Sequence, residues 1–177
     1  MKGHVCKICK FISITESAPD KCPVCGPSTD VGPSLDFAGD GAPKTTFEEK
    51  ENAVLTPKDA NNKTELEKKH EPLIIIVRKC GLIAEGCTDV HVKMGEILHP
   101  MQPEHFIRHI DFYIDKGFIA RVHLTPEALN PAAALHLKAG GGPSTGVGPS
   151  RAVSGDRKLA VIALCNIHGA WIKEVDL

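Results

Sequence analysis

Three short stretches of this sequence contain the side chains best suited to bind a metal ion. His70 lies in KKHEP, His99 and His105 enclose the stretch HPMQPEH, and Cys165 precedes His168 in CNIHG. The prolines between the second pair would interrupt a helix, so this stretch is predicted to be a bent loop. Five ligands exceed the four that close a structural zinc site, and imidazole with thiolate suits iron. If the stretches meet, they predict a reactive metal centre with an open position.

A second set of metal-ligand residues occupies the first 26 residues. It comprises two Cys-x-x-Cys pairs, namely Cys6, Cys9, Cys22 and Cys25. Four thiolates can close one tetrahedral ion, and so short a segment has few other means of holding a fold. Four unliganded thiols are the weaker alternative. The pattern therefore predicts a small four-cysteine metal domain over residues 1–26.

The identity of the ion in this N-terminal domain is less sharply indicated. The stretch APDKCPVCG resembles the rubredoxin-like module of rubrerythrins, which holds iron with four cysteines. The sequence departs from that module at Lys10, where glycine is usual. A positive φ at this position would strain a lysine by about 1 kcal/mol. Zinc ribbons use the same spacing, so the expectation is iron, with zinc as the alternative.

Composition limits the classes of function. The chain has 177 residues, 42% of them hydrophobic, and a net charge of −1, so no strong basic field points to nucleic acid or a membrane surface. The longest apolar run, LIIIV at 73–77, is too short to span a bilayer. The start, MKGHVCKIC, has no apolar signal core. We therefore expect a cytoplasmic protein, in which seven cysteines indicate metal ligands more than disulfides.

The elements that must position these ligands follow from the pattern after residue 64. Residues 27–64 are rich in Pro, Gly, Ser, Thr and charge and are expected to form a linker, with one short helix after Thr56-Pro57. From Leu73 onward, seven apolar runs separated by turn residues predict an all-β domain, an immunoglobulin-like seven-stranded β-sandwich over 65–177. The expected strands are 73–80, 87–94, 105–115, 118–124, 132–138, 157–164 and 170–176. The Gly-rich tract at 139–150 is expected to be a surface insertion.

Loops of a sandwich cluster at its two ends, so the three ligand stretches can meet at one of them. HPMQPEHFI, CNIHGAW and KHEP before an apolar strand resemble the superoxide reductases of the desulfoferrodoxin and neelaredoxin family. The resemblance covers roughly residues 66–177. It implies a mononuclear non-haem iron with His70, His99, His105 and His168 in a plane and Cys165 as the axial ligand. It also implies one-electron reduction of superoxide to hydrogen peroxide, an electron donor such as rubredoxin, and a homodimer or homotetramer.

Lys69, directly before His70, matches the family lysine that attracts superoxide and orders a proton-donating water. A solvated surface charge is the ordinary role of a lysine, but the position beside a ligand favours function. Lys68 stands where the family commonly has a glutamate that closes the sixth position of the ferric ion. Glu67 lies one residue further back, and Glu104 is a weak substitute.

Two other classes of protein fit part of the pattern. A cupredoxin-like electron carrier would bind copper through Cys, two His and an axial Met, and Met101 is the available methionine, but none follows His168. A structural zinc protein leaves the extra ligand unexplained. Cys80 and Cys87 could face each other across a hairpin, as buried apolar residues first and as a redox pair second. The remaining histidines match no family ligand: His4, His91, His109, His123 and His136.

Overall fold

A computed structural model of the chain describes residues 1–26, 46–78, 80–83, 86–138 and 157–177. The chain divides into two compact units, Met1–Ala53 and Val54–Leu177. The expected insertion at 139–150 lies outside the described residues. Within the described ranges, no helix has both the length and the apolar character needed to cross a membrane.

The N-terminal unit contains a small antiparallel sheet of order β2-β1-β3. Its strands are β1 (Gly3–Cys6), β2 (Ile12–Ser13) and β3 (Phe47–Lys50). Phe11 and Phe47 are both buried and pack edge to face with ring centroids 6.3 Å apart. Strand β3 falls inside the expected linker. Only Phe47 of this strand is buried and the next three residues are exposed, so the sequence carried no apolar alternation that would reveal a strand.

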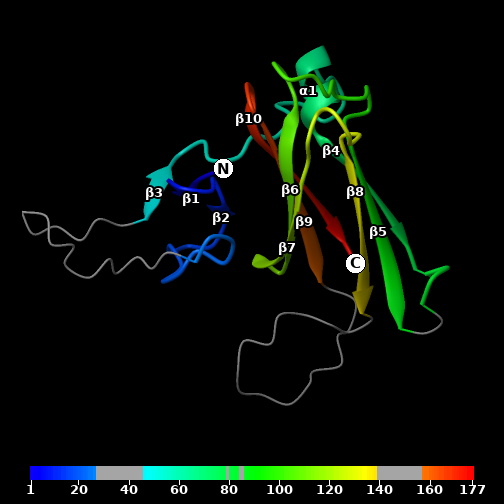
Figure 1. The fold of residues 1–177 in the computed structure, drawn as a ribbon, viewed down its shortest axis with the longest axis horizontal. Coiled ribbons are helices and arrows are strands. Elements are labelled where there is room, and N and C mark those ends of the chain that lie inside the picture. Colours follow the sequence, from blue (N-terminus) through cyan, green and yellow to red (C-terminus); the bar gives the residue numbers. More distant parts are fainter. Residues whose placement is uncertain (27–45, 79, 84–85, 139–156) are drawn as a thin grey trace, which may run out of the picture. The chain divides into compact units, whose positions relative to one another are not determined.

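The larger unit confirms the all-β prediction (Figure 1). One sheet has the strand order β10-β9-β6-β7 and the other has the order β4-β5-β8, with antiparallel pairing throughout. The seven strands are β4 (Pro72–Val77), β5 (Cys87–Met94), β6 (Ile107–Ile114), β7 (Gly117–His123), β8 (Ala132–Lys138), β9 (Lys158–Cys165) and β10 (Gly169–Asp176). These bounds lie within a few residues of the predicted strands.

Alternation along the strands produces the core between the two sheets. Val90, Val92 and Met94 of β5 are buried and belong to one cluster with Ile110 and Phe112 of β6. Burial of each such side chain stabilises the fold by about 1.5–3 kcal/mol. The intervening residues of β5 point to the outer face of its sheet.

One short helix, α1 (Glu65–His70), precedes β4 and lies at one end of the sandwich (Figure 1). Thr64 is its N-cap, and Thr64 and Glu67 form a reciprocal capping box. The helix therefore begins later than the expected position after Thr56-Pro57, because the Thr-x-x-Glu capping pair sets its start. Glu71 ends the helix in an extended conformation, immediately before the first residue of β4, Pro72.

Candidate metal centres

Five predicted ligands converge at the end of the sandwich near α1. His70 is the last residue of α1, His99 and His105 lie in the loop between β5 and β6, and Cys165 ends β9. One ligand atom from each of these four residues lies within 4.8 Å of the others. His168, in the turn between β9 and β10, places Nδ1 3.1 Å from Nε2 of His105 and 3.7 Å from Sγ of Cys165. The antiparallel pairing brings these strand ends together although the stretches are far apart in sequence.

The four imidazole rings stand at the corners of a near-square. Neighbouring ring centroids are separated by 4.6 Å for His70–His99, 4.6 Å for His99–His105, 4.8 Å for His105–His168 and 4.7 Å for His168–His70. The diagonal between His70 and His105 is 5.9 Å. Neighbouring ring planes are inclined by 67–86°. Four rings arranged in this way can direct one nitrogen each toward a common centre.

Hydrogen bonds to the outer nitrogens determine which nitrogens face that centre. Nδ1 of His70 donates to the carbonyl oxygen of Leu66 at 2.7 Å, and Nδ1 of His99 donates to that of Pro100 at 2.6 Å. The two Nε2 atoms then present lone pairs to each other at 3.1 Å. Facing lone pairs repel unless a cation lies between them. The donor set therefore fits a metal ion, with the backbone carbonyls fixing the tautomers.

Three of the four histidines have a lowered pKa, which favours the neutral form that binds metal. Burial lowers the pKa of His70, and it lowers the pKa of His99 to about 4. Burial also lowers the pKa of His105, with smaller contributions from His168 and Lys69. At neutral pH these three rings therefore carry no proton that a metal ion would have to displace.

The turn from Cys165 to Gly169 presents two of the ligands. Cys165 is buried, and its Sγ accepts the backbone N–H of His168 at 3.4 Å. Gly169 has φ of +78°, a left-handed conformation that glycine adopts without strain. Trp171 donates from Nε1 to the carbonyl oxygen of His168 at 3.3 Å, and its ring lies 5.5 Å from that of His70.

Asn166 joins this turn to the loop that contains His105, a role that the sequence analysis did not identify. Its Nδ2 donates to the carbonyl oxygen of Glu104 at 2.9 Å, and its Oδ1 accepts the backbone N–H of Phe106 at 2.9 Å. Its own backbone N–H donates to the carbonyl oxygen of Phe106 at 3.1 Å. The three bonds enclose His105 on both sides in sequence. An asparagine between a cysteine and a histidine ligand was the only signal available in the sequence.

Lys69 lies close enough to the histidines for its charge to act on them. It contributes to the lowered pKa of both His70 and His105, after burial and the other histidines. Its Nζ forms an ion pair with Glu65 one helical turn earlier. Its side chain is 34% exposed, so part of it remains in contact with solvent.

Glu67 does not reach the metal centre. Its carboxylate accepts hydrogen bonds from the backbone N–H of Thr64 at 2.7 Å, from the Thr64 hydroxyl at 2.8 Å and from the backbone N–H of Lys58 at 2.9 Å. These bonds bind it to the N-terminus of α1 and lower its pKa. The Glu67 alternative for the ferric sixth ligand is therefore disfavoured by the structure.

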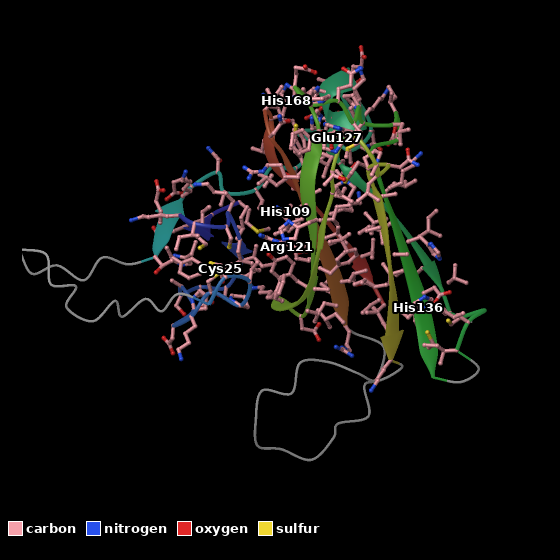
Figure 2. All side chains as sticks on the ribbon, viewed as in Figure 1. Cys25, His109, Arg121, Glu127, His136 and His168 are labelled. Carbon is pink, nitrogen blue, oxygen red and sulfur yellow. The ribbon has the colours of Figure 1, made fainter. Side chains whose placement is uncertain are left out.

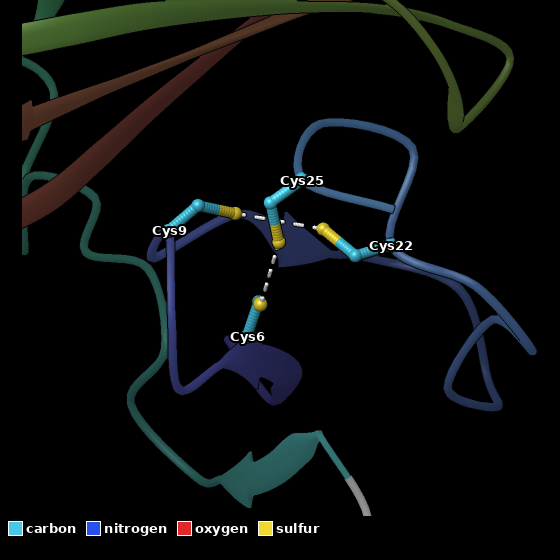
Figure 3. Close-up of side chains that lie close together, drawn as sticks. All are labelled: Cys6, Cys9, Cys22 and Cys25. Atoms are coloured by element: carbon cyan, nitrogen blue, oxygen red, sulfur yellow. Dashed lines mark hydrogen bonds between the residues drawn. The ribbon is translucent and has the colours of Figure 1, made fainter. Parts of the chain in front are cut away.

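The four N-terminal cysteines also converge (Figure 3). Sγ of Cys6 lies 3.7 Å from that of Cys25, and Sγ of Cys9 lies 3.5 Å from that of Cys22. Among the described residues none of the four takes part in a disulfide, and their sulfur atoms lie within 4.8 Å of one another. This spacing fits four thiolates around one tetrahedral ion.

Lys10 in this unit adopts φ of 60°, the left-handed conformation expected from its place at a usual glycine position. Its backbone N–H donates to the carbonyl oxygen of Cys6 at 3.0 Å, and its Nζ donates to that of Lys7 at 3.1 Å. These bonds hold the knuckle in shape despite the strain.

Met101, the methionine considered as a copper ligand, is partly buried against the hydrophobic cluster of the sandwich. The cupredoxin alternative therefore gains no support from it.

Comparison with known proteins agrees with this geometry. The family model described as desulfoferrodoxin matches residues 62–174, and the model of the rubredoxin-like domain of rubrerythrin matches residues 4–30. A putative superoxide reductase of Methanocaldococcus jannaschii is 34% identical over 116 residues, which are 64% of this chain and 86% of that protein. A desulfoferrodoxin of Syntrophotalea carbinolica is 29% identical over 157 residues, covering 87% of this chain and 93% of that protein.

A solved structure supports the fold alone. The superoxide reductase (neelaredoxin) from Ignicoccus hospitalis is similar with a TM-score of 0.51 at 23% sequence identity. The similarity covers 71% of this chain and 94% of that chain.

Proposed function

The chain belongs to the desulfoferrodoxin family, and on this premise we propose that it is a superoxide reductase. One superoxide, one electron and two protons give one hydrogen peroxide in this reaction. The observation that carries the proposal is the near-square of four histidines with Cys165 beside it. When bound at this site, ferrous iron supplies the electron. The four-cysteine unit adds a second iron centre, with zinc as the alternative occupant.

The residues of the chain have separate tasks in this proposal. His70, His99, His105 and His168 would hold the iron through one ring nitrogen each, and Cys165 would hold it through its thiolate. Neutral rings contribute no charge, so the thiolate is the only anionic ligand and a ferrous site keeps a net charge of about +1. That charge would favour the approach of an anionic substrate such as superoxide.

Lys69 is proposed as the residue that attracts superoxide and orders a proton-donating water. Its side chain is partly solvent-exposed, and its charge acts on two of the four histidines. A positive group beside the site raises the local concentration of an anion, and it can hold a water molecule in hydrogen-bonding range. The ion pair with Glu65 moderates that charge.

The proposal extends to partners and location. A small reduced carrier such as rubredoxin supplies electrons, with the four-cysteine iron as a one-electron relay. The chain forms a homodimer or homotetramer, a proposal supported by the row of exposed Leu73, Ile75 and Val77 on the end strand β4. The cytoplasm is the proposed compartment, because seven cysteines that supply metal ligands rather than disulfides suit a reducing environment.

The test uses the iron-loaded, prereduced full chain and a pulse of superoxide. We expect stoichiometric oxidation of the catalytic iron, followed as growth of its thiolate-to-iron absorption band, with hydrogen peroxide as the product. His105→Ala should abolish this reaction. His91→Ala is the matched control, because His91 is an exposed histidine on the outer face of β5 and should leave the rate unchanged.

Three results would contradict the proposal. The first is formation of molecular oxygen in proportion to peroxide, which indicates dismutation. The second is copper as the bound metal, with an intense blue colour. The third is an equal rate of reaction for the wild type and His105→Ala. Elemental analysis of anaerobically purified protein separates the metal alternatives before any kinetics.

A further inference from the structure

A third group of ligand-type side chains lies on the outer face of the β4-β5-β8 sheet. Cys87 and Asp89 are alternate residues of β5, opposite in direction to the core residue Val90. His136 on β8 is the cross-strand partner of Asp89. Cys80 lies in the connection between β4 and β5. One ligand atom from each of these four residues lies within 4.8 Å of the others.

This group is separate from the proposed iron centre. β4 begins two residues after His70 and runs away from it for six residues, or about 20 Å at the usual rise per residue. Figure 2 shows His136 toward the opposite end of the sandwich from His168. None of the four side chains can therefore reach the iron.

The contacts converge on one atom that cannot satisfy all of them by hydrogen bonding. Nδ1 of His136 lies 2.7 Å from Oδ1 of Asp89, 3.2 Å from Sγ of Cys80 and 3.9 Å from Sγ of Cys87. A ring nitrogen has either one hydrogen or one lone pair, so it makes one good hydrogen bond. Three ligand atoms gathered around that nitrogen indicate a shared centre.

The spacing matches that of a tetrahedral metal site. Bonds of 2.0–2.3 Å to a central zinc ion put neighbouring ligand atoms about 3.3–3.8 Å apart. The sulfur contacts of His136 span 3.2–3.9 Å, and Sγ of Cys87 lies 3.6 Å from Oδ1 of Asp89. The sulfur pairs of the four-cysteine site lie at 3.5 and 3.7 Å. The contact between His136 and Asp89, at 2.7 Å, is shorter than this spacing and must lengthen to admit an ion.

The chain around Cys80 has the backbone form of a metal knuckle. The N–H groups of Leu82 and Ile83 point at Sγ of Cys80, at 3.3 and 3.2 Å. These are the second and third residues after the cysteine. The N–H groups of Ile8 and Cys9 hold the same positions relative to Cys6 in the four-cysteine site, where they favour the thiolate. Two donors to one sulfur stabilise the anionic form that binds metal.

We propose that Cys80, Cys87, Asp89 and His136 bind one Zn²⁺ ion in a closed, structural site. Two thiolates, one imidazole and one carboxylate are all zinc ligands, and four of them leave no open position for a substrate. The ion ties the turn after β4 to the outer face of the sheet. His136 is 41% exposed at its side chain, which gives the ion access from solvent. The site is independent of superoxide reduction.

A disulfide between Cys80 and Cys87 is the competing arrangement. It would require oxidation of two thiols to one S–S bond with loss of two electrons and two protons. It would also leave the convergence of Asp89 and His136 on the same point without a role. The metal site explains all four side chains together, and a disulfide at this position would rule it out.

The test titrates Zn²⁺ into the iron-loaded full chain kept under reductant, with heat of binding and elemental analysis as readouts. We expect one zinc per chain in addition to the iron, with the visible iron bands unchanged. Co²⁺ in place of Zn²⁺ should give the intense d–d bands of a tetrahedral thiolate site. Cys80→Ser and His136→Ala should each lose this binding at least tenfold.

His91→Ala is the matched control. His91 lies on the same face of β5, two residues beyond Asp89, and its cross-strand partner on β8 is Ala134. This variant should bind zinc as the wild type does. Retained iron bands in every variant show that the sandwich is folded, so loss of zinc then reports the site itself.

The proposal is overturned by any of three results. The first is no uptake of Zn²⁺ or Co²⁺ by the reduced, iron-loaded chain. The second is uptake that is unaffected by both Cys80→Ser and His136→Ala. The third is a Cys80–Cys87 disulfide in protein that was alkylated and digested without exposure to oxidant.

Discussion

Lys69 illustrates how much a single charge can matter beside this metal centre. Its ammonium acts on His70 and His105, while an ion pair with Glu65 draws on the same charge. The charge of Lys69 contributes to the lowered pKa of His70 and His105, whereas the charge of the preceding Lys68 is not among the main causes of either shift. The two lysines therefore form a natural pair for experiment.

Lys69→Ala should slow the second-order reaction with superoxide by roughly tenfold and flatten its dependence on ionic strength, because the attracting charge is lost. Lys68→Ala should change the rate much less. Glu65→Gln should raise the rate, because it releases the ammonium from its ion pair. Pulse radiolysis at several salt concentrations measures all three. Equal rates for the two lysine variants would remove Lys69 from the proposal.

Lys10 is a residue whose backbone is strained by its place in the knuckle. Its φ of 60° is a conformation that glycine adopts without penalty. Lys10→Gly should therefore stabilise the metal-loaded N-terminal unit by about 1 kcal/mol, less the entropy that glycine gains in the unfolded chain. Release of the N-terminal metal in increasing denaturant measures the effect. Lys7→Gly is the control, because Lys7 lies in the same knuckle but has no positive φ. It should not stabilise the N-terminal unit.

At the scale of elements, the connection after β5 holds α1 in place. Gly95 has φ of +79°, and its backbone N–H donates to the carbonyl oxygen of Glu71 at 3.2 Å. The N–H of Ile97 donates to the carbonyl oxygen of Lys68 at 3.2 Å. The carbonyl groups at the end of a helix have no partner N–H within the helix, because no further turn follows. The two bonds from Gly95 and Ile97 supply such partners for Glu71 and Lys68. The helix and His70 therefore depend on a loop that follows β5.

Gly95→Ala should cost about 2 kcal/mol or more and disturb iron binding. A Cβ there would lie 2.3 Å from the carbonyl oxygen of Ile97 and 2.6 Å from those of Lys68 and Lys69. These are backbone atoms, so α1 must move and take His70 with it. Gly169→Ala has the same positive φ with no atom within 4 Å of the added Cβ. It should lose only about 1 kcal/mol in thermal unfolding, which isolates the clash.

Asn166 couples two further elements, the β9–β10 turn and the loop before β6. Asn166→Ala should cost about 1–2 kcal/mol and shift the thiolate-to-iron absorption band, because Cys165 and His105 lose their common support. Asn166→Asp keeps the acceptor for the Phe106 N–H but loses the donor to the Glu104 carbonyl. Its stability and its band shift should lie between those of the wild type and Asn166→Ala. A band that is unchanged in Asn166→Ala, with stability equally reduced, would assign Asn166 a purely structural role.

At the scale of the whole molecule, two compact units carry two different donor sets. The unit Met1–Ala53 has four thiolates, which suit one-electron transfer at iron, and the unit Val54–Leu177 has four imidazoles and one thiolate. The proposed division of labour is electron relay in the first and substrate reduction in the second. It predicts that the two functions can be separated by mutation.

The variant with both Cys9→Ser and Cys22→Ser should lose the N-terminal iron but retain the catalytic iron. Its prereduced form should consume one equivalent of superoxide at the wild-type rate, because the catalytic ligands are intact. Re-reduction by reduced rubredoxin should be slower, which stopped-flow absorption at the thiolate-to-iron band measures. Re-reduction at the wild-type rate would show that the four-cysteine site is structural.

The sequence by itself determined the two sets of ligand-type residues and the seven strands of the sandwich. Cys-x-x-Cys spacing and alternating apolar residues are local patterns, so they can be recognised in the sequence without knowledge of the fold. Strand β3 was not predicted, because Phe47 is its only buried residue and one apolar residue makes no alternating pattern. The role of Glu67 also remained open, since its capping bonds depend on where α1 begins.

Only the tertiary structure decided which ligand-type residues meet. Cys80 and His136 are 56 residues apart, and their contact depends on the pairing of β5 with β8 in one particular register. A shift of one residue would turn His136 to the other face of the sheet. Asn166 and Gly95 act through contacts of the same kind, made between segments that are distant in sequence. Register and strand order arise from packing of the whole core, so no local stretch of sequence contains them.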